Sequence, residues 1–324
     1  MANHYTEVTS QGYFSRLGGS IKGVIGGFVM IALSCLLLFW NEGRAIKTAR
    51  SLEEGAGAVV EAKPDAVDAA NDRKEIHFTG DARTSETLSD PKFGVSAPAI
   101  HLRRKAEMYQ WKETKRERSV ERVGGRRETE VSYDYDTGWD ASAIDSSEFR
   151  HPEDHRNPAM PFRSELFSAR EVMVGAYRLS SGLVGQMDAF EALPVSDTAG
   201  VEAPPGVRVR SLDGGLYLGN DPAKPAVGDL RVSFQVVKPA LVSIVAMQNG
   251  STLAPYATHE GGTIELLRMG SVGAAQIFKE EQDKNATLTW ILRGLGFFVM
   301  FLGFYALFRP LVMVVNVLPF LGDL

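Results

Sequence analysis

Two long apolar segments, one near each end of the chain, constrain the fold more than any other feature. Residues 23–40 form an 18-residue run without a charge, which as a helix spans about 27 Å, close to the hydrocarbon thickness of a bilayer. Residues 288–308 form a second such run. We therefore expect two transmembrane helices. Five side chains are predicted to anchor them at the membrane interface: Trp40, Arg44, Lys47, Trp290 and Arg293.

These runs predict a membrane protein of the α+β class in five segments. They are a short N-terminal segment (1–22), a first helix (23–42), a large β-rich domain (43–286), a second helix (287–309) and a further hydrophobic segment (310–324). The last segment is interrupted by Asn316 and Pro319 and is predicted to be re-entrant or interfacial, with Arg309-Pro310 ending the second helix. Two crossings would place residues 1–20 and 41–287 on opposite sides. A cleaved signal peptide is less consistent, since no small-x-small site follows the first run.

The composition outside these runs is that of a globular domain. The chain is 44% hydrophobic and 23% charged with a net charge of −5, which gives no reason to expect a nucleic-acid partner. Its single cysteine, Cys35, lies inside the first apolar run, so no internal disulfide is possible. Basic residues lie on both sides of the first apolar run, so they do not decide which way the first helix is oriented in the membrane.

The clearest strand signal is a long hairpin in which Gly124-Gly125 separates two arms. Residues 103–127 hold ten Lys/Arg and four Glu, whereas residues 128–154 hold nine Asp/Glu and one Arg. Cross-strand pairing of Arg116 and Arg118 with the acidic arm explains this pattern better than binding of nucleic acid or anionic lipid. Further strands are expected over residues 58–61, 75–79, 170–179, 206–212, 229–237, 241–246 and 262–267, and a helix from residue 274 leads into the second run.

Three glycines at four-residue spacing, Gly19, Gly23 and Gly27, share one face of the first helix. Small residues let membrane helices approach closely, because apolar burial does not drive helix association in lipid. We therefore predict that this face packs against another helix.

Motifs of soluble enzymes are absent from the sequence, which contains no Walker A, Rossmann, H-E-x-x-H or G-x-S-x-G pattern, and no cofactor is expected. One alternative is a polar intramembrane site at Asn41 and Glu42, with Arg309 and Asn316 as further members. A weaker alternative is a metal site at His151, Asp154 and His155, although Pro152 and Pro158 mark that stretch as a loop.

Several stretches, spread in order along the chain, carry a resemblance to a known family. They are WNEGRAIKTARSLEEG (40–55), LRRKAEMYQWKE (102–113), IDSSEF (144–149), HRNPAMPFRS (155–164), GDLRVSF (228–234) and the region from Ile264 into NATLTWILR. In these stretches the chain resembles the transmembrane protein 43 family, also called LUMA, and looks like a bacterial member. The resemblance implies one N-terminal membrane helix, a large luminal or periplasmic domain and a cluster of C-terminal helices. Because relatives have further spans after the position of Leu324, the chain is expected to be truncated.

The resemblance brings no established catalytic residues with it. It implies location in the endoplasmic reticulum or inner nuclear membrane in a eukaryote, and in the inner membrane with a periplasmic domain in a bacterium. Our leading hypothesis is a non-enzymatic scaffold that forms homo-oligomers and binds lipids and other membrane proteins. The alternative is an intramembrane enzyme or lipid-handling protein built around Asn41 and Glu42.

Overall fold

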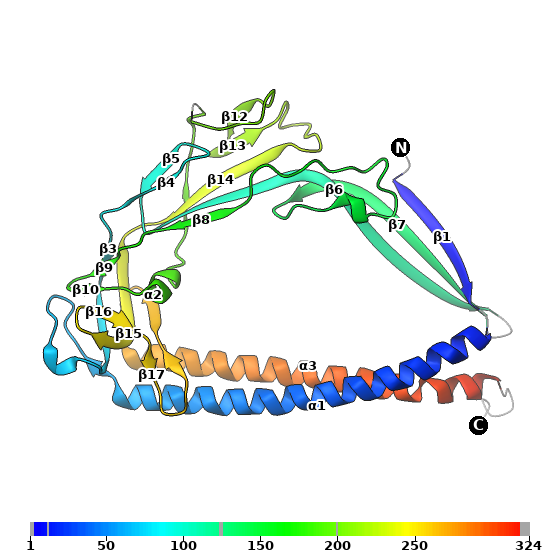
Figure 1. Ribbon diagram of the computed structural model, residues 1–324, viewed down its shortest axis with the longest axis horizontal. Helices are drawn as coiled ribbons and strands as arrows, with labels where there is room; N and C mark the ends of the chain where they lie inside the picture. Colours follow the sequence, from blue (N-terminus) through cyan, green and yellow to red (C-terminus); the bar gives the residue numbers. More distant parts are fainter. Residues whose placement is uncertain (1–2, 12, 123–125, 199, 318–324) are drawn as a thin grey trace. The chain divides into compact units, whose positions relative to one another are not determined.

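The computed structural model describes residues 3–11, 13–122, 126–198 and 200–317, and it divides the chain into two compact units. The strand-rich unit comprises Glu53–Thr114 and Tyr135–Phe278, and the helical unit comprises Ala2–Leu52, Lys115–Asp134 and Lys279–Leu324. The helices are α1 (Tyr13–Ala58), α2 (Ser181–Gly185) and α3 (Ala274–Val317). The strands, labelled in part in Figure 1, are β1 (His4–Gln11), β2 (Val60–Glu61), β3 (Glu75–Arg83), β4 (Thr87–Asp90), β5 (Val95–Pro98), β6 (His101–Arg122), β7 (Arg126–Asp140), β8 (Glu165–Ser168), β9 (Met173–Val174), β10 (Tyr177–Arg178), β11 (Glu191–Leu193), β12 (Val209–Leu212), β13 (Gly215–Leu218), β14 (Leu230–Val237), β15 (Ala240–Asn249), β16 (Thr252–Ala254), β17 (Tyr256–Ala257), β18 (Thr263–Ile264) and β19 (Leu266–Met269).

Two long helices, α1 with 46 residues and α3 with 44, contain the predicted apolar runs. Each is long and apolar enough to cross a membrane, over Gly23–Ala58 and Ala274–Arg309. The helix expected to lead from residue 274 into the second apolar run is confirmed, and it is continuous with the second helix predicted over residues 287–309. The predicted end at Arg309-Pro310 is wrong, because α3 continues through Pro310 to Val317. A proline removes one main-chain donor from a helix but does not always end it. Residues 318–324 of the predicted re-entrant segment lie outside the described residues.

The predicted charged hairpin is present as β6 and β7, and its Gly124-Gly125 turn lies outside the described residues. These strands belong to an eight-stranded sheet in the order β1-β7-β6-β14-β13-β12, in which β11 also pairs with β14 and β8 with β6. Arg116 forms the predicted cross-strand pair, with its Nε 3.6 Å from a carboxylate oxygen of Asp134. Arg118 has no such pair among the residues that the structure describes.

The pairing of the strand β1 bears on the predicted membrane topology. Residues 4–11 pair antiparallel with residues 127–134 of β7, and Thr6 lies opposite Ser132. The Nδ1 atom of His4 lies 2.6 Å from a carboxylate oxygen of Asp134. A single crossing of the membrane by α1 would separate these two strands, so the pairing of β1 with β7 and the predicted separation of residues 1–20 from residues 41–287 exclude each other.

A seven-stranded sheet, in the order β19-β15-β16-β10-β9-β3-β2, completes the strand-rich unit, and β15 also pairs with β3. One hydrophobic core joins the two sheets, with Ile76 and Ile244 from this sheet and Leu102 and Phe234 from the other. The strand predicted over residues 170–179 is instead two short strands. Gly175 adopts a φ of +58° between them, a left-handed conformation that glycine favours.

A buried pair of opposite charges lies beside this core. The guanidinium of Arg104 is buried and pairs with the buried carboxylate of Asp90, and it also contacts Glu165 at 2.6 Å. Its Nε donates to the carbonyl oxygen of Arg163 at 2.9 Å. These bonds offset the desolvation of the buried charge.

Candidate functional site

Four polar side chains join α1 to α3, and we call this group the polar clamp: Asn41, Arg44, Asn285 and Thr289. The Nδ2 atom of Asn41 donates to the carbonyl oxygen of Thr289 at 3.1 Å, and that of Asn285 donates to the carbonyl oxygen of Ala45 at 3.0 Å. Each helix therefore donates a side-chain amide hydrogen bond to a main-chain carbonyl of the other. A carbonyl already bonded within its helix can accept a second bond through its other lone pair.

The guanidinium of Arg44 lies at the centre of the clamp. It donates to the side-chain oxygens of Asn285 at 2.9 Å, of Thr289 at 3.0 Å and of Asn41 at 3.3 Å. Arg44 was predicted to reach the lipid headgroups, and the structure instead places its charge between the helices. In a medium without water, a polar group is satisfied by the nearest protein partner.

Glu42, a member of the alternative intramembrane site, forms a bidentate ion pair with Arg293. The two N–O distances are 2.7 Å and 2.8 Å. The Arg293 guanidinium also lies 4.8 Å from the centroid of the Trp290 ring. Both carboxylate oxygens are therefore engaged across the helix pair, an arrangement that fixes the register of two helices.

The remaining members of the alternative site lie elsewhere. Arg309 is exposed, and it follows Arg293 by 16 residues (309 − 293), or about 24 Å along α3. The surroundings of Asn316 lie outside the described residues. Trp40, Lys47 and Trp290 are exposed on the helices, as interface anchors would be. The structure thus brings Asn41 and Glu42 to the helix contact and does not join Arg309 to them.

Glycine contacts continue the helix pairing beyond the clamp. A Cβ atom placed on Gly27 would lie 2.7 Å from the carbonyl oxygen of Gly303, and one on Gly296 would lie 2.6 Å from the Leu38 side chain. Gly23 faces open space, contrary to prediction, and the surroundings of Gly19 lie outside the described residues. Only Gly27 of the predicted glycine face is therefore seen in the contact.

The residues that α3 contributes to this helix contact were not predicted from the sequence. Thr289, Gly296 and Gly303 are spaced by seven residues, and Asn285 precedes Thr289 by four. That spacing puts small and polar side chains on one face of a helix, and it was the available signal. The seven-residue spacing was not recognised because Gly294, two residues before Gly296, does not fit it.

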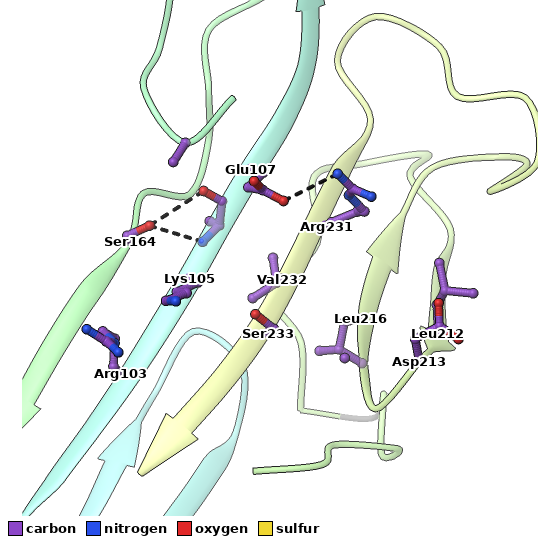
Figure 2. A pocket seen from close by; sticks show the side chains of 13 residues that line it. Arg103, Lys105, Glu107, Ser164, Leu212, Asp213, Leu216, Arg231, Val232 and Ser233 are labelled. Atoms are coloured by element: carbon purple, nitrogen blue, oxygen red, sulfur yellow. Dashed lines mark hydrogen bonds and ion pairs between the residues drawn. The ribbon is translucent and has the colours of Figure 1, made fainter. Parts of the chain in front are cut away.

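A pocket of about 740 Å³ opens on the strand-rich unit, lined by side chains of β6 and β14, by Ser164 and by the turn between β12 and β13 (Figure 2). Three of its lining residues are basic and two are acidic: Arg103, Lys105, Arg231, Glu107 and Asp213. Alternation along β6 and β14 puts these strand residues on the outer face, opposite the buried core residues.

Most charges of this pocket are already paired. Arg103 donates to the side-chain oxygen of Gln235 at 2.6 Å and stacks 3.5 Å from the centroid of the Phe190 ring. Arg231 lies 3.4 Å from a carboxylate oxygen of Glu107. A dashed line marks this pair in Figure 2. Within the described part of the chain, the side chain of Lys105 has no hydrogen bond or ion pair. The pocket therefore offers one open cation to an anionic group, and it does not assemble a nucleophile with a base.

The predicted metal loop is held by ring stacking and hydrogen bonds. The buried His155 ring stacks on Tyr135 with 3.9 Å between centroids, and its Nδ1 donates to the carbonyl oxygen of His151 at 3.0 Å. The Tyr135 hydroxyl donates to Glu113 at 2.5 Å and accepts from the His151 main-chain N–H at 3.0 Å. Across the described ranges, no group of three or more His, Cys, Asp or Glu side chains is arranged to hold a metal ion, and Asp154 belongs to no such group.

Comparison with known proteins identifies the family. The profile of the family described as Transmembrane protein 43 matches residues 108–324. The chain is 38% identical to Transmembrane protein 43 of Mus musculus over 337 residues, covering 99% of this chain and 82% of that protein. It is also 38% identical to the Homo sapiens protein, covering 97% and 80%, and 28% identical to a Drosophila melanogaster homolog, covering 86% and 74%. No solved structure matches. The chain therefore belongs to the transmembrane protein 43 family and is a membrane protein with transmembrane helices.

Proposed function

We propose that this chain is a membrane scaffold that self-associates and organises partner membrane proteins through its large non-cytoplasmic domain. In a bacterium this domain would be periplasmic, and in a eukaryote the protein would belong to the endoplasmic reticulum or inner nuclear membrane. The polar clamp and the Glu42–Arg293 pair support a structural role for the polar groups of the helices, because most of their hydrogen-bonding atoms are engaged between α1 and α3.

The observation that carries the proposal is the three-stranded ribbon β1-β7-β6 at one end of the eight-stranded sheet. Among the described residues, β1 is the end strand, with β7 on one side and no strand on the other. An end strand presents main-chain donors and acceptors that can pair with a strand of another chain. Val8 on β1 is 66% exposed, which adds an apolar side chain to this edge. We assign the edge to self-association.

The test is the mass of the detergent-solubilised full-length particle, measured by light scattering. The chain is expected to be an oligomer, and Val8→Lys is expected to reduce it to smaller particles because a lysine at a strand edge opposes edge-to-edge pairing. Val67→Lys is the matched control, since Val67 is an exposed valine in the strand-rich unit, 38% exposed, and should leave the mass unchanged. A wild-type monomer with no co-purifying protein would overturn the scaffold proposal.

The alternative function, an intramembrane enzyme or lipid-handling protein using Asn41 and Glu42, gives a different result for Glu42→Gln. A scaffold keeps its particle mass and co-purifying proteins when Arg293 retains one neutral acceptor. An enzyme keeps its fold and loses turnover or bound lipid. Measuring both the co-purifying proteins and the lipids, by mass spectrometry, separates the two functions.

A further inference from the structure

A buried carboxyl group lies inside the strand-rich unit, beside the last residues of α1 and the first residues of α3, which belong to the same unit. Glu75 begins β3, is 1% exposed, and has no hydrogen-bond partner for either carboxyl oxygen among the described residues. It plays no part in the helix contact or the pocket described above. A buried polar group without a partner carries a large desolvation cost, and a charged one carries more.

The surroundings of Glu75 come from α1, α3 and β18. A Cβ atom placed on Gly55, near the end of α1, would lie 3.0 Å from Oε2 of Glu75 and 3.0 Å from the Phe278 ring. The Ile264 side chain contacts the same point. The carboxyl group of Glu75 is thus packed against the backbone of α1, with apolar side chains of β18 and α3 beside it. All of these residues belong to the strand-rich unit.

The ionisable groups that face Glu75 are acidic or neutral. Glu54 of α1 is the neighbouring charge, and it accepts hydrogen bonds from Nδ1 of His259 at 2.7 Å and from the His259 main-chain N–H at 3.0 Å. Tyr256 of β17 lies near both acids, and burial raises the pKa of its hydroxyl, with Glu54 and Glu75 adding to the rise. His77, on the same strand as Glu75, is committed to Glu61 at 2.8 Å and to the carbonyl oxygen of Val272 at 3.0 Å.

We propose that Glu75, with Glu54 and Tyr256, forms a proton-dependent junction that holds the end of α1 and the start of α3 against β3, and that opens when Glu75 loses its proton. The protonated acid is neutral and suits its apolar neighbours Ile264 and Phe278. The ionised form places a second negative charge beside Glu54, and no hydrogen bond among the described residues balances it, so water must enter or the elements must separate.

The direction of the pH dependence follows from the acid's two states. Burial raises the pKa of Glu75 from about 4.5 to about 7 in the folded chain, and the charge of Glu54 adds to the rise. Between these two values the folded state binds more protons than the unfolded state, so stability falls as the pH rises. The stabilisation is complete below about pH 4.5 and is lost as the pH passes through about 7.

Infrared spectroscopy and hydrogen exchange on the full chain in detergent test the proposal. The protonated-carboxyl band is expected to disappear near pH 7 in the wild type, to be missing in Glu75→Gln and to persist in the control Glu53→Gln, whose exposed side chain precedes Glu54. At pH 8, amides of residues 53–58 and 274–278 should exchange several-fold faster in the wild type than in Glu75→Gln. At pH 5 the two proteins should exchange equally.

Comparison of the variants at one pH cancels the intrinsic pH dependence of exchange. A wild-type band that titrates below pH 5, or equal exchange in both proteins at pH 8, would overturn the proposal. If Glu75→Gln does not fold, Glu54→Gln provides the second test. Removing the neighbouring charge should move the midpoint of the band to a lower pH, and an unchanged midpoint would count against the junction.

Discussion

The helix pair and the strand-rich unit bury opposite kinds of side chain. In the helix pair Asn41 is buried, while Phe39 and Phe297 are exposed. In the strand-rich unit Phe78 and Phe234 are buried. Apolar side chains face the surroundings that exclude water, so the contrast indicates lipid around the helices and water around the strand-rich unit.

The contrast also separates two sources of stability. The strand-rich unit gains about 25 cal/mol for each Å² of apolar surface that it removes from water. The helix pair gains little from that source, because lipid tails are as apolar as the side chains, and close packing and polar contacts replace it. The same substitution should therefore have different effects in the two regions.

The largest expected effect lies in the water-excluded core. Arg104→Met leaves the carboxylate of Asp90 buried without its guanidinium, and removal of one partner of a buried pair costs about 3–5 kcal/mol. Thermal unfolding of the full chain in detergent measures the loss. Arg83→Met is the control, because Arg83 and Asp81 form an exposed pair at 3.0 Å and should contribute little. Equal effects of the two variants would show that Arg104 is not part of a dry core.

An intermediate effect is expected at the helix contact. Gly27→Leu places a side chain against the carbonyl oxygen of Gly303, and overpacking of this kind costs about 1–3 kcal/mol. Spin labels at the exposed positions Ile25 and Tyr305 should report a longer and broader inter-helix distance by double electron–electron resonance. Gly23→Leu should leave the distance unchanged, because Gly23 faces open space. The packing account is wrong if both variants behave alike.

The smallest effect is expected at the N-terminal strand β1, whose strand partner among the described residues is β7. In a Cys35→Ser background, cysteines that replace Thr6 and Ser132 should form a disulfide on mild oxidation, because facing residues of antiparallel strands lie within bonding range. Replacement of Thr6 and Glu128, which precedes Ser132 by four residues on β7, is the control and should not give a cross-link. Stability should change little.

This cross-link also decides the membrane topology. Pairing of β1 with β7 and a single crossing by α1 exclude each other, since one crossing would separate the two strands. If the cysteines introduced at positions 6 and 132 were labelled from opposite faces of sealed vesicles and formed no disulfide, β1 and β7 would not be paired.

The sequence was sufficient for features that depend on local pattern. The apolar runs predicted both long helices, the alternating charged arms predicted β6 and β7, and residues 229–237 predicted β14 almost to the residue. The strand predicted over 170–179 failed because a tertiary contact decides it. The left-handed Gly175 backbone lies against the carbonyl of Pro64, and no local pattern reports that contact.

Among the site residues too, local sequence pattern was predictable and tertiary contacts were not. Asn41 and Glu42 were recognised as unusual at the end of an apolar run, but their partners lie 248 and 251 residues away in sequence and could not be read from one segment. The basic residues Arg44 and Arg293 were predicted to anchor at headgroups, and both bind across the helix pair. Glu75 carried no sequence signal, because its burial results from the packing of α1, β18 and α3 around the start of β3.

The most direct test of the central claim, that the helices face lipid and the strand-rich unit faces water, is photolabelling from within the bilayer. A diazirine carried on a lipid acyl chain is activated in reconstituted vesicles, and the labelled residues are mapped by mass spectrometry. The account predicts label on outward-facing side chains such as Phe28 and Phe301, and none on Asn41 or on the strand-rich unit. Unlabelled helices, or label spread evenly over both regions, would contradict it.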